Sequence, residues 1–213
     1  MSCTPTLTAR GLAALRQLAQ QQLPQERCDF CSLELAEGHE HLVEPASRRL
    51  ICACYACAVL FSSSGETKYR RVPRDVRYLQ DFHLPDEQWN GLGIPVTMVF
   101  FFQSSISSRI AAFYPSPAGP TESLLDLDAW EEIVENNPIL RTLTPDVEAL
   151  LVNRVATARD YYLAPIDQCY KLIGLMRRHW RGFSGGDTAW AEIGRFFSDL
   201  QRRSTGISVG RHA

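Results

Sequence analysis

Two hydrophobic runs near the middle of the chain are separated by a short polar segment. The runs IPVTMVFFFQ (94–103) and SSRIAAFYP (107–115) are rich in β-branched and aromatic residues, which favour strands. The polar segment SSISS joins them, so the pattern predicts a β-hairpin. The proline-rich segment PSPAGP (115–120) then predicts a loop.

Three later segments place hydrophobic residues at helical spacing. DLDAWEEIVENNP (126–138) begins with an aspartate cap and stops at a proline. PIDQCYKLIGLMRRHW (165–180) starts with a proline that suits a first helical turn, and another helix begins near Asp187. The pattern therefore predicts three amphipathic helices. Their hydrophobic positions are Trp130, Ile133 and Val134; Ile166, Tyr170, Ile173 and Met176; and Trp190, Ile193, Phe197 and Leu200.

The segments VEALLVNRV (147–155) and DYYLAPI (160–166) fit a helix or a strand by periodicity alone. Tyr161, Tyr162 and the nearby Pro165 favour strands. The sequence therefore groups strands and helices without strict alternation, which predicts an α+β fold with a small antiparallel or mixed sheet packed with helices.

The N-terminal part has a different pattern. Residues 8–23 place leucines near one helical face before Pro24, which predicts an amphipathic helix. HLVE and RRLIC flank PAS in a predicted short hairpin, CYACAVLF predicts one or two helical turns, and SSSGE predicts a linker. We therefore expect a helix and a Cys-rich metal-binding module in residues 1–64, and an α+β body in residues 65–213.

Composition narrows the class of protein. The chain has 213 residues, a net charge of −2 and 45% hydrophobic residues, so its overall charge favours neither nucleic acid nor a membrane as partner. Its longest apolar run is far too short to span a bilayer, and its first residues do not resemble a signal peptide. Seven cysteines, an odd number, suit a metal site in a reducing compartment better than a disulfide framework. We expect a soluble, cytoplasmic protein.

The strongest motif is a pair of C-x-x-C sequences. Cys28 and Cys31 form the first pair, and Cys54 and Cys57 form the second, with 22 residues between the pairs. Two thiolates at this spacing can turn toward one ion, and two such pairs complete a tetrahedron. The sequence therefore predicts a four-cysteine metal site in a knuckle that resembles a zinc ribbon or a treble clef.

Cys52 is a surplus thiol beside the second pair. If the strand through RRLIC continued one step further, Cys52 and Cys54 would share a face, and Cys52 could replace Cys54 as a ligand. The C-x-x-C spacing favours Cys54 and leaves Cys52 in reserve. His39 and His41 offer further possible donors, but we expect them to be exposed polar residues that lead into the hairpin.

Zinc and iron both suit four thiolates. Rubredoxin-like knuckles usually carry glycine after the second cysteine, whereas this chain has Ser32 and Ala58 there. That difference favours a closed structural zinc site and leaves iron as the alternative. A treble-clef nuclease is disfavoured, because no matching Asn/His arrangement follows Cys57 and the region is not basic.

A second possible contact site lies in HWRGFSGGDTAW (179–190). Backbone N–H groups at Gly185 and Gly186, together with Arg181, could hold an anion or a partner at a helix N-terminus. The same glycines could simply form the turn between two helices. No hydrolase, phosphate-loop, zinc-protease or dinucleotide motif occurs in the sequence, so we name no catalytic residue.

Two stretches taken together resemble a known family: RCDFCSLELAEGHEHLVEPASRRLICACYACAVLF and PIDQCYKLIGLMRRHWRGFSGGDTAWAEIGRFF. They are similar to an uncharacterised bacterial family whose members are often encoded beside [NiFe]-hydrogenase genes. The resemblance implies an accessory or maturation role, with a hydrogenase subunit or maturation factor as partner. Residues in the family's two segments are Cys28, Cys31, Cys52, Cys54 and Cys57, and Tyr170, Trp180, Arg181, Gly185 and Gly186.

These observations lead to two main hypotheses, beside a third in which an enzyme uses Arg181 and the Gly-Gly turn on an anionic substrate. The first is a non-enzymatic accessory protein that zinc stabilises and that binds a protein partner near a hydrogenase. The alternative is a rubredoxin-like electron carrier with iron in the same four thiolates.

Overall fold

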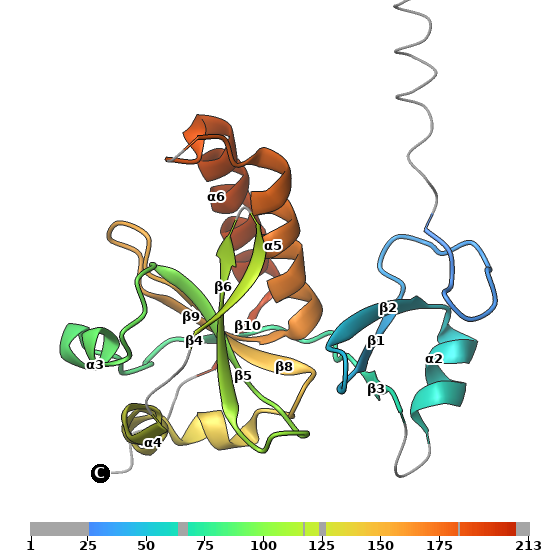
Figure 1. The fold of residues 1–213 in the computed structure, drawn as a ribbon, viewed down its shortest axis with the longest axis horizontal. Helices are drawn as coiled ribbons and strands as arrows, with labels where there is room; N and C mark the ends of the chain where they lie inside the picture. Colours follow the sequence, from blue (N-terminus) through green and yellow to red (C-terminus); the bar gives the residue numbers. More distant parts are fainter. Residues whose placement is uncertain (1–25, 64–67, 117, 124–126, 183, 208–213) are drawn as a thin grey trace, which may run out of the picture.

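A computed structural model describes residues 26–63, 68–116, 118–123, 127–182 and 184–207. The predicted helix at 8–23 and part of the SSSGE linker lie outside the described residues. Figure 1 shows a small three-stranded module beside a larger body. Both parts combine sheet and helix, and the predicted α+β class is confirmed. None of the helices in the described residues is long and apolar enough to cross a membrane.

The small module contains the predicted hairpin and helix. Its strands are β1 (Glu40–Glu44), β2 (Arg49–Ala53) and β3 (Arg70–Arg71), and its helix is α2 (Tyr55–Ser62). Strand β1 lies between β2 and β3 and is antiparallel to both. On the α2 side of the hairpin, Leu42, Ile51 and Ala53 pack with Ala58 in a small core. The hairpin and the helix thereby bury one face against each other.

A seven-stranded mixed sheet forms the centre of the body. The strand order is β10-β4-β9-β8-β5-β6-β7, and only β10 and β4 pair in parallel. The hairpin predicted from the two hydrophobic runs is confirmed as β5–β6, and the two ambiguous segments are confirmed as the strands β8 and β9. The bounds are β4 (Arg77–Leu79), β5 (Met98–Gln103), β6 (Ile110–Ser116), β7 (Gly119–Ser123), β8 (Glu148–Asn153), β9 (Asp160–Pro165) and β10 (Thr205–Ile207).

Helices cover both faces of this sheet. One face packs against the long helices α5 and α6, with Phe100 and Phe102 in the shared core. The other face, with Val99 and Phe101, packs against the shorter helices. Strand β5 is therefore buried on both faces, which explains its continuous hydrophobic run. The helices are α3 (Asp86–Gly91), α4 (Leu127–Asn136), the 3₁₀ helix η1 (Pro138–Thr142), α5 (Ile166–His179) and α6 (Gly186–Arg203).

One local prediction is wrong. The sequence predicts a loop at PSPAGP, but β6 runs to Ser116, β7 begins at Gly119, and Pro115 pairs with Pro120. Proline cannot donate to a ladder, so it is confined to edges and strand ends. Strand β7 lies at the edge of the sheet, and Pro115 lies beyond the part of β6 that pairs with β5. Both prolines therefore lie at positions in the sheet where proline is tolerated.

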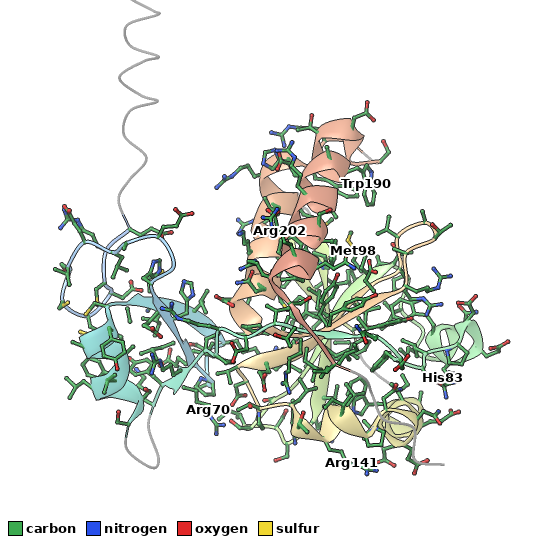
Figure 2. All side chains as sticks on the ribbon, turned by 180° about the vertical axis from the view of Figure 1, so that it is seen from behind. Arg70, His83, Met98, Arg141, Trp190 and Arg202 are labelled. Atoms are coloured by element: carbon green, nitrogen blue, oxygen red, sulfur yellow. The ribbon has the colours of Figure 1, made fainter. Side chains whose placement is uncertain are left out.

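The module contacts the body through the hairpin face opposite α2. Val43 is buried in the same core as α5 and α6. The Tyr170 hydroxyl on α5 donates to the Arg48 carbonyl at 3.0 Å. Arg70, labelled in Figure 2, pairs with Asp146 at 3.2 Å. The hairpin thus has one face toward the cysteines and α2 and one face toward α5.

Candidate metal centre

The first cysteine pair lies in a tight backbone turn. The Cys28 N–H donates to the Leu33 carbonyl and the Ser32 N–H donates to the Cys28 carbonyl, both at 2.8 Å. Ser32 has a φ of 61°, in the left-handed region that glycine favours. Serine therefore adopts a glycine-type conformation directly after Cys31. The absence of glycine at this position does not prevent a knuckle turn. It therefore no longer favours zinc over iron.

The second pair lies at the start of a helix. Cys54 is the N-cap of α2 and Cys57 lies in its first turn, where the Ala58 N–H donates to the Cys54 carbonyl at 2.9 Å. The helix N-terminus carries a partial positive charge that favours thiolates. Knuckle, hairpin and helix follow one another along the chain, which is the order of a treble-clef finger.

The four sulfurs of Cys28, Cys31, Cys54 and Cys57 lie within 4.8 Å of one another. Cys31 Sγ and Cys54 Sγ are 3.8 Å apart. A tetrahedral ion with sulfur ligands at about 2.3 Å would hold them about 3.8 Å apart. Figure 2 shows sulfur atoms gathered at the side of the module that faces away from the body. The four thiols can therefore bind one metal ion.

The thiols also differ in acidity. Burial raises the pKa of Cys28, but backbone N–H groups of Cys54, Cys31 and Phe30 that donate to its sulfur lower the pKa to about 6. Burial and the neighbouring thiols raise the pKa of Cys57 to about 12. Crowded sulfurs therefore cannot all ionise without a compensating charge, which a metal cation supplies.

Cys52 lies in a different group of side chains. Strand β2 ends at Ala53, so the alternation of the strand does not extend to Cys54. Cys52 pairs directly with His41 across the hairpin. It forms a second group with His39 and His41, in which possible ligand atoms lie within 4.8 Å of one another.

The expectation that both histidines are exposed is wrong. The side chains of His39 and His41 are only 8% and 23% exposed. Burial lowers the pKa of His41, but hydrogen bonds to Asp167 and Cys52 raise it to about 9. Sequence reasoning missed Asp167, because it lies 126 positions from His41 and carries no motif of its own.

The turn before α6 has a packing explanation. Gly185 has a φ of 85°, and a Cβ there would lie 2.9 Å from the Trp180 ring. The Arg181 N–H donates to the Gly185 carbonyl at 3.1 Å, and its guanidinium donates to the Trp180 carbonyl at 2.8 Å. Gly186 also has a positive φ of 75°. These contacts explain the Gly-Gly pair as a turn, and an anion or partner contact there stays a prediction.

Comparison with known proteins gives one match. No curated protein and no solved structure matches the chain. One family matches residues 27–204, which include both cysteine pairs, the two histidines and the turn before α6. The matched range covers most of the 213 residues. The chain therefore belongs to DUF5947, a family of unknown function.

Proposed function

We propose that this protein is a non-enzymatic accessory protein in which a zinc ion at Cys28, Cys31, Cys54 and Cys57 stabilises a small docking module that lies beside an α+β body. The observation that carries the proposal is the group of four sulfurs within 4.8 Å of one another. All four side chains come from the module, so the ion would fix the knuckle to α2 without help from the body. A closed set of four protein ligands is typical of structural zinc.

The choice of zinc rests on how the second cysteine pair is placed. A rubredoxin-type iron site uses two similar knuckles, whereas here the second pair lies on the N-terminus of α2. A rubredoxin-like electron carrier remains the second candidate. It is supported by the backbone N–H groups that donate to the Cys28 sulfur, since such bonds tune the potential of iron–thiolate sites.

Metal analysis separates the two candidates. Protein purified without added metal is analysed for zinc and iron, and its visible spectrum is recorded. We expect a colourless protein with zinc. A red protein with iron would overturn the proposal in favour of the electron carrier.

The docking surface that we propose consists of exposed apolar side chains on the knuckle and α2. Leu33, Tyr55 and Leu60 are 58%, 68% and 69% exposed. Phe30 of the knuckle stacks on Phe61 of α2 with ring centroids 4.2 Å apart, so apolar side chains of the knuckle and the helix are in contact. Exposed apolar patches are a common feature of protein interaction sites, which supports this proposal. The family resemblance favours a hydrogenase subunit or maturation factor as the partner.

A binding experiment tests this surface. The wild-type chain and the Leu60→Ser variant are expressed in the native host, and the hydrogenase subunits that co-purify are measured. We expect Leu60→Ser to reduce their recovery. Ile106→Ser is the matched control, because Ile106 is 68% exposed but lies on the body. Equal recovery with all three chains, or no hydrogenase protein with any, would contradict the proposal.

A further inference from the structure

The hairpin face that points to the body carries three metal-ligand side chains in addition to the four cysteines. His41 and Cys52 are direct cross-strand partners, and His39 lies two positions before His41, where an extended chain returns to the same face. Possible ligand atoms of all three side chains lie within 4.8 Å of one another. Two imidazoles and a thiolate are the donor types that zinc and similar transition-metal ions prefer.

His39 is arranged as a ligand. Its Nδ1 lies 3.2 Å from the Ala36 carbonyl oxygen. A carbonyl can only accept a hydrogen bond, so Nδ1 carries a proton, and the Glu26 carboxylate lies 3.5 Å from the same nitrogen. In the neutral ring Nε2 then keeps its lone pair. Nε2 is buried without a hydrogen-bond partner in a side chain that is only 8% exposed. A buried imidazole nitrogen with nothing to bind is costly, and a metal ion would satisfy it.

His41 is oriented by a group from the body. Its Nδ1 lies 3.0 Å from Asp167 Oδ2, and the carboxylate accepts the Nδ1 proton. A metal ion at Nε2 would take the place of the proton that the ring carries there, as metal binding to histidine generally does, and would give the carboxylate–histidine arrangement that commonly supports metal ligands. Asp167 lies in the first turn of α5, so it comes from the body while His41 comes from the module. Its other oxygen, Oδ1, is buried without a partner.

We propose that His39, His41 and Cys52 form a second metal site for Zn²⁺ or a similar transition-metal ion, with Asp167 as the positioning residue for His41. The site is separate from the four cysteines, and its existence does not depend on the metal that they bind. Three protein ligands leave a fourth coordination position, which distinguishes an exchangeable or reactive ion from a closed structural one. His39 and His41 line a cavity of about 600 Å³ that could admit a ligand to that position.

The site also connects the two parts of the molecule. The three ligands belong to the module, whereas Asp167 belongs to the body. Binding of an ion would favour the contact between the hairpin and α5, because the His41–Asp167 hydrogen bond orients a ligand only while the two parts are in contact.

Cobalt titration of the metal-free full-length chain tests the proposal. Co²⁺ reports on its ligands, because each thiolate adds charge-transfer absorption and tetrahedral sites add visible bands. We expect the wild-type chain to bind two equivalents and Cys52→Ser to bind one. Cys52→Ser should also lose roughly one-fifth of the thiolate absorption, since it removes one of five thiolates. The remaining four-thiolate spectrum shows that the variant module is folded.

Further variants exclude a general loss of folding. His39→Gln keeps all the cysteines and should also lose the second equivalent. Asp167→Asn should weaken the second Co²⁺ roughly 10- to 100-fold while leaving the first unchanged. His83 is an exposed histidine of the body. As a control, the His83→Asn variant should still bind both ions. The proposal is wrong if the wild-type chain binds a single Co²⁺, or if both Cys52→Ser and His39→Gln still bind two.

Discussion

The two faces of the β1–β2 hairpin carry two different kinds of candidate metal site. On the α2 side, all four cysteines come from one stretch of chain, between Cys28 and Cys57. On the body side, His39, His41 and Cys52 come from the hairpin, but the group that orients His41 comes from α5. The first arrangement is local, whereas the second gains the group that orients His41 only when the module packs against the body. The two sites should therefore respond differently to the same perturbation.

The largest expected effect comes from removing a ligand of the four-cysteine site. Cys54→Ser should abolish metal binding at the four cysteines, and a structural zinc ion in comparable small modules contributes on the order of 10 kcal/mol of binding free energy. We expect amides of β1, β2 and α2 to lose protection in hydrogen exchange while those of β5 and β8 keep theirs. Cys169→Ser, at a buried cysteine of α5, is the control for loss of a thiol. Full protection of β1 and β2 in Cys54→Ser would show that the module does not need the ion.

A second prediction concerns the core between the hairpin and α2. Leu42 is fully buried on the side of the four cysteines. Leu42→Ala should destabilise the module by about 2–5 kcal/mol, because it leaves a cavity. The measurement is denaturant unfolding of the metal-loaded chain, followed by the cobalt absorption of the four-thiolate site. Leu60→Ala removes the same atoms from an exposed position on α2 and should change stability by less than about 0.5 kcal/mol. Equal effects of the two variants would contradict a packed module core.

The α2 side of the hairpin, with its four cysteines, could be predicted from the sequence. The contact between the hairpin and α5 could not. The two C-x-x-C pairs, the hairpin and α2 follow from spacing and short-range pattern, because the chain that forms them is short. Strand alternation would place Cys52 on the same face as Cys54 only if the strand continued, but β2 ends at Ala53. Asp167 reaches His41 only through the packing of α5 on the hairpin. No periodicity in the sequence encodes that contact.

The same reasoning explains why the sequence predicts neither the module strand β3 nor the body elements β4, β10 and α3. Strands β3, β4 and β10 have two or three residues each, which is too short for a periodic pattern. Helix α3 lies between a proline and a glycine-rich segment, and its six residues bury Trp89 rather than a full hydrophobic stripe. By contrast, β5 and β8 are long and buried on both faces. The composition of β5 predicts a strand, whereas β8 is ambiguous by periodicity, and the strand prediction there rests on the neighbouring Tyr161, Tyr162 and Pro165.

A smaller effect is expected at the contact between the two parts. Tyr170→Phe removes the hydroxyl that donates to the Arg48 carbonyl at 3.0 Å. Loss of one hydrogen bond should cost about 0.5–1.5 kcal/mol. If the second site depends on this contact, its Co²⁺ affinity should fall by up to roughly tenfold, while the four-cysteine site binds as before. Tyr114→Phe on β6 is the matched control. Equal weakening of both sites would mean that they are not separate.

The smallest effect is expected at the edge of the knuckle, where Arg27 pairs with Glu34 at 2.9 Å. Both side chains are more than half exposed, at 59% and 56%, and exposed ion pairs typically contribute about 0.2–1 kcal/mol. If the metal ion, rather than this pair, holds the knuckle, Arg27→Ala should lower the unfolding free energy of the metal-loaded chain by less than about 1 kcal/mol. Its Co²⁺ affinity at the four cysteines should stay within a few-fold of wild type. In the metal-free chain the same substitution should have no larger effect, since the pair is screened by water in either state. If Arg27→Ala instead lost as much Co²⁺ affinity as Cys54→Ser, the ion pair and not the metal ion would hold the knuckle in place.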